Sequence, residues 1–210
     1  DLASSAMMTT PTRRPMATEI ATWYDRAARD LPWRRPDATP WAVLVSEIML
    51  QQTPVARVLP AYARWLARWP AAADLAADAP GEAVREWGRL GYPRRALRLH
   101  AAATTIVRQH DGKVPSRYDQ LRALPGIGDY TAAAVATFAY RQRHAVLDTN
   151  VRRVLARALD GIGGPPASVT IAERARAESL RQDDAELASR YCVGLIELGA
   201  LVCRSREPLC

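Results

Sequence analysis

The five-residue break Leu124–Gly128 constrains the fold more than any other feature, because it separates two helical patterns. Its proline cannot continue a helix, and Gly126 and Gly128 permit positive φ angles and close backbone approach. The next residue, Asp129, is suited to cap the small-residue helix that follows. The sequence therefore predicts two helices joined by a tight hairpin at the start of residues 121–157.

Such a hairpin has a chemical use. With no side chains at Gly126 and Gly128, backbone N–H groups can point at one anion, and the following helix N-terminus adds about half a positive charge. This arrangement would clamp a DNA phosphate without reading base sequence. An ordinary helical hairpin with a glycine-containing turn is the alternative.

Composition agrees with a polyanionic partner, since the net charge is +7 and excess positive charge favours such partners. No apolar run reaches the roughly 18 residues of a membrane helix. Residues 1–18 lack the apolar stretch of a secretory signal, so we interpret them as a disordered leader. Three cysteines do not resemble a secreted disulfide scaffold, which makes the cytoplasm the expected compartment.

A carboxylate lies in the middle of an apolar helical surface. Trp41, Leu44 and Ile48 form this surface, and Glu47 falls among them. A desolvated carboxyl has a raised pKa and can act as an acid near neutral pH; the alternative is an exposed glutamate. The amides that follow, at residues 51–52, can bond to base edges or fill the gap left by a base.

A second carboxylate, Asp148, lies twenty residues after Gly128 in the sequence Leu-Asp-Thr-Asn-Val. It is also suited to cap the helix that starts at Val151. A capping role is compatible with a catalytic one, because capping would keep the carboxylate ionised.

Two loops carry aromatic and basic residues. In the first loop, Trp33 and Arg34 could contact an extruded base or its phosphate. The alternative is that Trp33 packs on the core and Arg34 faces solvent. In the second, Tyr92 precedes a basic helix whose arginines suit phosphates or form a solvated face, namely Arg94, Arg95 and Arg98.

The ordered motifs LPGIG and LDTNVRRVLAR resemble the helix-hairpin-helix DNA glycosylase superfamily. Within it, residues 46–53 (SEIMLQQT) and 31–34 (LPWR) resemble MutY-type enzymes, which remove adenine mispaired with 8-oxoguanine. The resemblance covers about residues 19–210. It implies an all-α, two-lobed fold with a DNA groove between the lobes: a helical barrel lobe at 37–147, and an iron–sulfur-type lobe from 19–36 and 148–210.

The resemblance also implies residue roles. Glu47 would protonate adenine N7, and Asp148 would stabilise the oxocarbenium-like sugar, as paired carboxylates do in glycosidases. Tyr92 would wedge into the DNA, where it partly replaces the stacking lost on base extrusion. The remaining expected substrate contacts are Trp33, Arg34, Leu50, Gln51, Gln52, Tyr130 and Asn150. The expected phosphate contacts are Gly126, Gly128, Arg94 and Arg152.

Strand cleavage is not expected. Bifunctional relatives use a lysine just after the hairpin to form a Schiff base, and Tyr130 occupies that position here. The only lysine is Lys113, in a predicted turn. We expect a monofunctional, monomeric enzyme acting on double-stranded DNA with adenine opposite 8-oxoguanine or guanine.

The sequence Cys203-x6-Cys210 resembles the first half of a C-x6-C-x2-C-x5-C pattern, which ligates a [4Fe–4S] cluster in the family. Only two of the four expected metal ligands are present, so we interpret the iron–sulfur loop as truncated; a form without the cluster is the alternative. We expect Cys192 to be a buried packing thiol.

Two other functions fit the same motifs. One is a pyrimidine-directed glycosylase acting on thymine mismatches. The other is a truncated, non-catalytic module that binds damaged DNA. The base released, and whether any base is released, distinguish the three.

Overall fold

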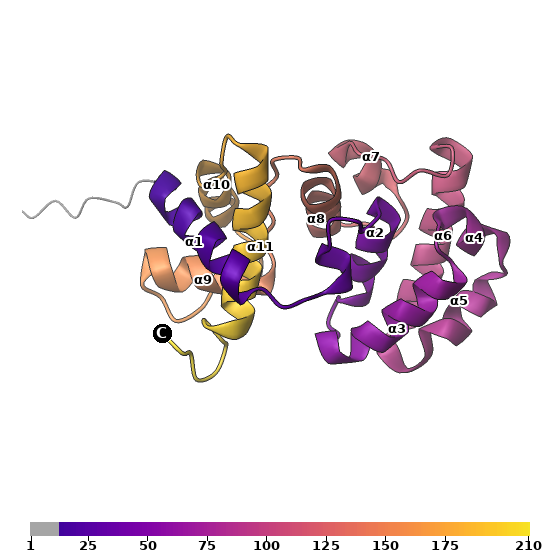
Figure 1. Ribbon diagram of the computed structural model, residues 1–210, viewed down its shortest axis with the longest axis horizontal. Coiled ribbons are helices and arrows are strands. Elements are labelled where there is room, and N and C mark those ends of the chain that lie inside the picture. Colours follow the sequence, from indigo (N-terminus) through magenta and orange to yellow (C-terminus); the bar gives the residue numbers. More distant parts are fainter. Residues whose placement is uncertain (1–12) are drawn as a thin grey trace, which may run out of the picture. The chain divides into compact units, whose positions relative to one another are not determined.

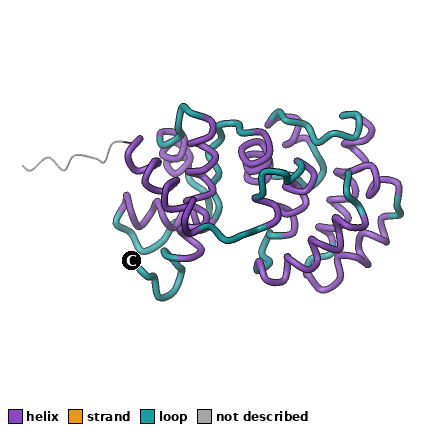
Figure 2. The backbone as a smooth tube through the Cα atoms, viewed as in Figure 1, coloured by secondary structure: helices purple, strands orange, loops and turns teal. Residues whose placement is uncertain are grey.

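The computed structural model describes residues 13–210, and every element within that range is helical (Figure 1). The first helices are α1 (Arg13–Ala27), η1 (Pro32–Arg34), α2 (Pro40–Met49), α3 (Val55–Arg68), α4 (Ala72–Ala77), α5 (Pro80–Trp87) and η2 (Gly88–Leu90). The remaining helices are α6 (Arg94–Gln109), α7 (Tyr118–Ala123), α8 (Asp129–Tyr140), α9 (Thr149–Asp160), α10 (Ile171–Ser179) and α11 (Ala185–Leu201). Short loops join them (Figure 2). The all-α expectation is confirmed for the described residues.

The chain forms two compact units. Unit 1 combines residues up to Arg29 with Leu147–Cys210, and unit 2 is the continuous segment Asp30–Val146. Residues 30–36 thus belong with the hairpin-containing unit, whereas the sequence placed them in the other lobe. The reason is packing, because Leu31 is buried and the Trp33 ring meets Tyr62 edge-on at 5.1 Å.

In unit 1, helix α11 packs against both α1 and α9. Close approach depends on two glycines of α11: a Cβ on Gly194 would lie 2.8 Å from Ile20 Cγ2, and a Cβ on Gly199 would lie 2.5 Å from Asn150 Cβ. The fully buried Glu197 accepts hydrogen bonds from Arg29 Nε (2.6 Å) and Nη2 (3.0 Å), which joins the chain after α1 to α11.

Helix α1 begins earlier than the sequence suggested. Residues 1–18 were expected to be a disordered leader, but α1 starts at Arg13. Ala17 is fully buried in the core of unit 1, so this turn of helix has packing to stabilise it. Residues 1–12 lie outside the described part of the chain.

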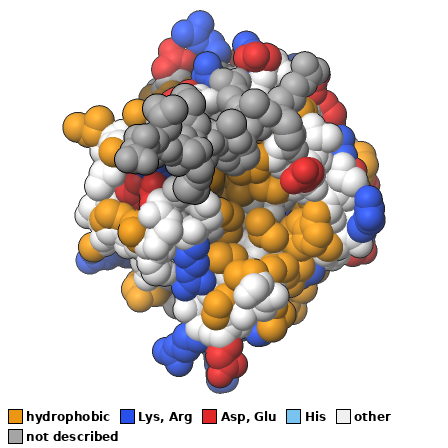
Figure 3. Space-filling view, turned by 90° about the vertical axis from the view of Figure 1, so that its left-hand side faces the viewer, with side chains coloured by type: hydrophobic (Ala, Val, Ile, Leu, Met, Phe, Trp, Pro, Cys, Tyr) orange, Lys and Arg blue, Asp and Glu red, His pale blue; other side chains and the backbone are white. Residues whose placement is uncertain are grey.

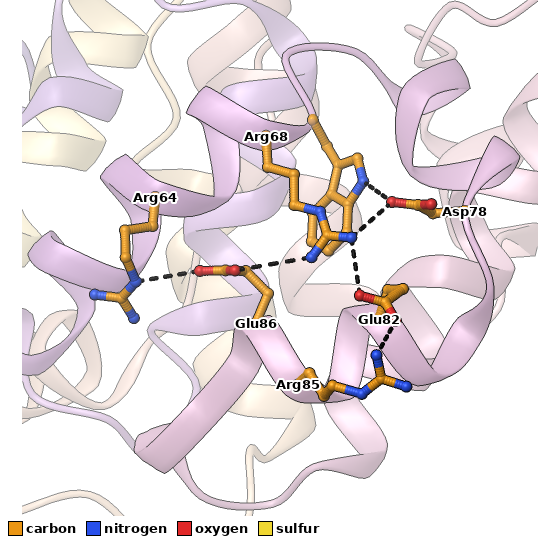
Figure 4. A network of polar contacts seen from close by, with 7 residues as sticks. Arg64, Arg68, Asp78, Glu82, Arg85 and Glu86 are labelled. Atoms are coloured by element: carbon orange, nitrogen blue, oxygen red, sulfur yellow. Dashed lines mark hydrogen bonds and ion pairs between the residues drawn. The ribbon is translucent and has the colours of Figure 1, made fainter.

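Unit 2 has a large apolar core that includes five tryptophans, three of which contact one another. Trp65 meets both Trp69 (4.6 Å) and Trp87 (5.6 Å) edge-on. A polar network covers this cluster and links α3 to α5 and the turn before it: Arg68 bonds to Asp78 (3.1 Å) and Glu82 (2.9 Å) (Figure 4). Helix α2 is joined to this cluster by Trp41, whose Nε1 donates to the Trp69 carbonyl (3.0 Å).

The surface of unit 1 carries exposed hydrophobic side chains. Figure 3 shows hydrophobic groups on one face of the molecule, and the most exposed large hydrophobic side chains in the described part of unit 1 are Ile171 (88%) and Leu209 (67%). Scattered exposure of this kind is common in folded proteins. Within residues 13–210, no helix has the length and hydrophobicity needed to cross a membrane.

Candidate active site and nucleic-acid interface

The carboxylate of Glu47 lies inside unit 2. Thr39 caps α2 by accepting a hydrogen bond from Ala42 N (3.1 Å), and Pro40 fits the first helical position. Every residue from Trp41 to Met49 is buried, and Glu47 is only 7% exposed. The predicted burial of Glu47 is therefore confirmed. Burying a carboxylate is costly unless it is paired, hydrogen-bonded or protonated, and buried carboxyl groups are frequent at functional sites.

The turn after α2 carries both glutamines. Leu50 ends the helix and is half-buried, and Gln51 Nε2 donates to Thr131 Oγ1 on α8 (3.4 Å). Gln52 is exposed and has φ 55°. A left-handed backbone costs a side chain of this type about 1–2 kcal/mol, so surrounding contacts must hold it there. This turn projects an amide outward, one turn beyond the buried acid.

A second loop projects an aromatic ring. Tyr92 follows Gly91, has φ 49° and is 64% exposed. An exposed tyrosine in a strained conformation is unusual, and such outliers concentrate at functional positions. Arg94, at the first position of α6, is also exposed.

The neighbouring Arg95 differs from the expectation that it faces phosphates. It is 6% exposed, and its guanidinium donates to backbone carbonyls of both loops just described. Burial lowers the pKa of Arg95, although an arginine remains charged near neutral pH. Arg95 is thus an internal cation. Residue type alone does not reveal this, because the exposed Arg94 and Arg98 are the same residue on the same helix.

The hairpin between α7 and α8 has the predicted form. Gly126 has φ 78°, and a Cβ there would lie 2.7 Å from Arg98 Cβ, so only glycine fits. Gly128, in contrast, has an extended backbone (φ −91°) and is the N-cap of α8. Asp129 is therefore the first helical residue and not the cap, and it pairs with Arg122. No side chain caps α8, whose N-terminus carries the positive end of the helix dipole.

In unit 1, Asp148 caps α9. Its carboxylate accepts hydrogen bonds from Val151 N (2.6 Å) and Asn150 Nδ2 (2.9 Å). The cap role is confirmed, and these hydrogen bonds favour the ionised carboxylate, as expected. Burial raises the pKa of Asp148 above its ordinary value, and the hydrogen bonds offset this only in part.

An arginine that the sequence did not single out supports this carboxylate. Arg153 donates to Asn150 Oδ1 (2.8 Å) and to the carbonyls of Gly199 (2.7 Å) and Cys203 (2.8 Å). It thereby orients Asn150, which in turn holds Asp148. The available signal was spacing, because Asn150 and Arg153 lie three residues apart on one helix face.

Comparison with known proteins places this geometry in a family. The model of the HhH-GPD superfamily base excision DNA repair protein matches residues 45–177. The chain belongs to this superfamily. The matched residues include Glu47, the turn after α2, the hairpin between α7 and α8, and the capping residue Asp148.

Curated relatives of this superfamily member are named adenine DNA glycosylase. That of Mycolicibacterium smegmatis is 52% identical over 192 residues, which is 91% of this chain and 64% of the relative. The human protein is 39% identical over 199 residues, covering 91% of this chain and 36% of the relative. The chain thus spans less than two thirds of these relatives' length.

Solved structures agree on the helix-hairpin-helix glycosylase fold. A thermostable thymine-DNA glycosylase is 26% identical with a TM-score of 0.82, covering 94% of this chain and 90% of that one. An endonuclease III trapped as a covalent intermediate with DNA is 23% identical, with a TM-score of 0.77 and coverages of 93% and 88%. At 23% identity, the likeness to endonuclease III shows the fold alone. The expected helix-hairpin-helix glycosylase fold is confirmed.

Two side chains expected to meet DNA have internal partners instead. Trp33 is 6% exposed and belongs to the core of unit 2. Arg152 donates to Glu173 (2.9 Å) and to the Pro166 carbonyl (2.7 Å), and its side chain is 10% exposed. Arg152 therefore joins α9 to the segment that leads into α10. Arg34, at the end of η1, and Tyr130, at the second position of α8, are half-buried.

The cysteines do not by themselves form a cluster site. Cys203 is buried, Cys210 is exposed, and both are free thiols. A [4Fe–4S] cluster needs four ligands, and the described residues contain no group of three or more that could hold a metal ion. Cys192 is half-buried on α11, so it is not the fully buried packing thiol that was expected. The residues present do not fit the cluster, and no step of the chemistry below depends on it.

Proposed function

We propose that this chain hydrolyses the N-glycosidic bond of adenine opposite 8-oxoguanine or guanine in double-stranded DNA. The observation that carries the proposal is Glu47, a carboxylate buried in an apolar helix and followed at once by an exposed amide turn. The printed names of the mycobacterial and human relatives support adenine as the base.

The two carboxylates have different tasks in this proposal. Glu47 donates a proton to adenine N7, which makes the base a better leaving group as the C1′–N9 bond breaks. Asp148, when ionised, stabilises the oxocarbenium-like sugar, and water then adds at C1′ and gives its proton to a carboxylate. Asn150 and the Val151 N–H orient Asp148.

DNA is held through its backbone. The N-terminus of α8, reached through Gly126 and Gly128, has no side-chain cap, and the positive end of its helix dipole attracts a phosphate. The exposed Arg94 adds a cation, while Gln52 and Tyr92 contact the strands at the extruded base. We propose a monomer acting on one damaged pair at a time.

Strand cleavage by a Schiff base is not part of the reaction. The second residue of α8 is Tyr130, which has no amine. Lys113 lies exposed in the turn after α6. Borohydride should therefore trap no covalent DNA complex through a side-chain amine of this chain.

A thymine mismatch glycosylase is the second candidate, because the thermostable thymine-DNA glycosylase has the same fold at 26% identity. The buried Glu47 and the 52% identity to an adenine enzyme favour adenine. The released base decides between them.

The test is single-turnover base release from duplexes with A opposite 8-oxoguanine, A opposite G and T opposite G. We expect adenine release from the first two and loss of release in Glu47→Gln. The control is Glu178→Gln, which removes only an exposed ion pair with Arg181. Release of thymine alone would move the protein to the second candidate, and DNA binding without any release would indicate a binding module.

A further inference from the structure

A single buried side chain joins the two loops that project Gln52 and Tyr92. The guanidinium of Arg95 reaches both loops, and the hydrogen bonds divide between its two terminal nitrogens. Nη1 donates to the carbonyls of Ile48 (3.2 Å), Met49 (3.1 Å) and Gln51. Nη2 donates to Thr53 Oγ1 (2.9 Å) and to the carbonyls of Leu90 (3.3 Å) and Gly91 (3.0 Å).

The position of these acceptors matters. Gln51 and Gly91 each immediately precede a residue in the left-handed conformation, Gln52 (φ 55°) and Tyr92 (φ 49°). Arg95 therefore fixes the peptide group that begins each strained residue. The Thr53 hydroxyl also donates to the Leu90 carbonyl (3.4 Å), so the loops contact each other directly.

The same cation interacts with aromatic rings. Its guanidinium carbon lies 5.6 Å from the centroid of the Tyr92 ring and 5.2 Å from that of Trp87. Cations within about 6 Å of a ring face are attracted to it. Trp87 Nε1 donates to the Gly91 carbonyl (2.9 Å), so the tryptophan supports the same loop. Arg95 thus restrains the ring of Tyr92 as well as its backbone.

We propose that Arg95 is a positioning residue that sets Gln52 and Tyr92 as one rigid pair for inserting into duplex DNA as the target base leaves the stack. The inference rests on the proposed function. Arg95 does not touch substrate in this scheme. It acts through the two exposed side chains, whose spacing it determines.

The chemistry requires arginine and not merely a positive charge. The guanidinium is a planar fork with five donors, whereas a lysine ammonium is a point charge with three. The bonds to Ile48 and Met49 also place a cation at the C-terminus of α2, where the helix dipole is negative. A lysine could place a positive charge at the C-terminus of α2 but could not donate hydrogen bonds to both loops.

The experiment compares Arg95→Met and Arg95→Lys with Arg108→Met, which removes an exposed arginine from the same helix. Single-turnover adenine release is measured on a duplex with A opposite 8-oxoguanine and on a strand with an unpaired, bulged A. Hydrogen exchange is followed at residues 50–54 and 90–93. The unpaired base needs little extrusion, so it reports the chemistry alone.

We expect Arg95→Met to slow release from the duplex by about 100-fold, the loss typical of misplaced groups, with a much smaller effect on the bulged substrate. Exchange should rise in both loops together and stay unchanged in the core helices. Arg95→Lys should resemble Arg95→Met, and Arg108→Met should match the wild type.

An equal loss on both substrates, or faster exchange throughout unit 2, would show that Arg95 only stabilises the fold and would overturn the proposal. Faster exchange in one loop alone would also overturn it. If Arg95→Met does not fold, full duplex activity in Arg95→Lys has the same consequence. No adenine release by the wild type from either substrate would refute the proposed function instead, while the exchange result would still decide whether Arg95 holds both loops.

Discussion

Gly199→Ala is the substitution whose effect follows most directly from the structure. The new Cβ would lie 2.5 Å from Asn150 Cβ and 2.9 Å from its Cα and carbonyl oxygen. Ordinary contact begins at 3.4 Å, so α9 and α11 would have to separate by about 0.9 Å. The obstructing atoms are mostly backbone, and no rotamer change can relieve the overlap.

Two terms set the change in stability. Overpacking costs about 1–3 kcal/mol, and replacing glycine by alanine within a helix returns about 1 kcal/mol. The free energy of unfolding should therefore fall by about 0–2 kcal/mol. The effect on activity should be larger, because Asn150 holds Asp148 and a displacement near 1 Å can cost about 100-fold in rate.

Gly194→Ala is the matched control on the same helix. Its Cβ would meet Ile20 Cγ2 at 2.8 Å and the Ile20 carbonyl oxygen at 3.3 Å, so the overlap falls on α1 and not on Asn150. Both variants are compared by urea unfolding and by single-turnover adenine release. The reasoning is refuted if the rate of the Gly199 variant equals that of the wild type, or if the Gly194 variant loses as much.

Three further perturbations follow from contacts already described. Asp148→Asn keeps a good N-cap and should abolish adenine release while stabilising the fold. Because burial raises the pKa of Asp148, the stability advantage of the Asn variant in urea unfolding should grow as the pH rises from about 4 through the folded-state pKa. A difference in stability that does not change with pH would contradict this. Glu197→Ala should lower the unfolding free energy by about 2 kcal/mol, because Arg29 loses its bidentate partner and the core gains a cavity; a change below about 0.5 kcal/mol in urea unfolding would argue against it. Gly126→Ala should destabilise the hairpin by about 2–5 kcal/mol, because the positive φ and the 2.7 Å approach of the new Cβ to Arg98 Cβ both oppose it, and Gly128→Ala, where a Cβ meets nothing within 4 Å, should lower stability by much less in the same assay.

The sequence predicted features whose cause is local. Proline and glycine at the hairpin, the Asp148 cap and the burial of Glu47 all follow from residue type and helical spacing. The starting point of α1 did not, because Ala17 is stabilised by a core built from residues more than a hundred positions later.

The roles of individual arginines were the least predictable. Arg94 and Arg95 are adjacent and chemically identical, yet one is exposed and the other binds carbonyls more than 40 residues away. Arg152 similarly bonds to Glu173 and not to solvent. Such partners are set by tertiary contacts, which no periodicity encodes.

The discontinuous make-up of unit 1 has a consequence for how the chain is made. Helix α1 leaves the ribosome before its packing partner α11, which follows about 170 residues later, a delay of about 10–35 s at ordinary synthesis rates. The apolar face of α1 must stay unaggregated for that time, while the continuous segment Asp30–Val146 can fold as it emerges. The order of synthesis thus gives α1 the longest exposure to chaperones and proteases of any helix described here.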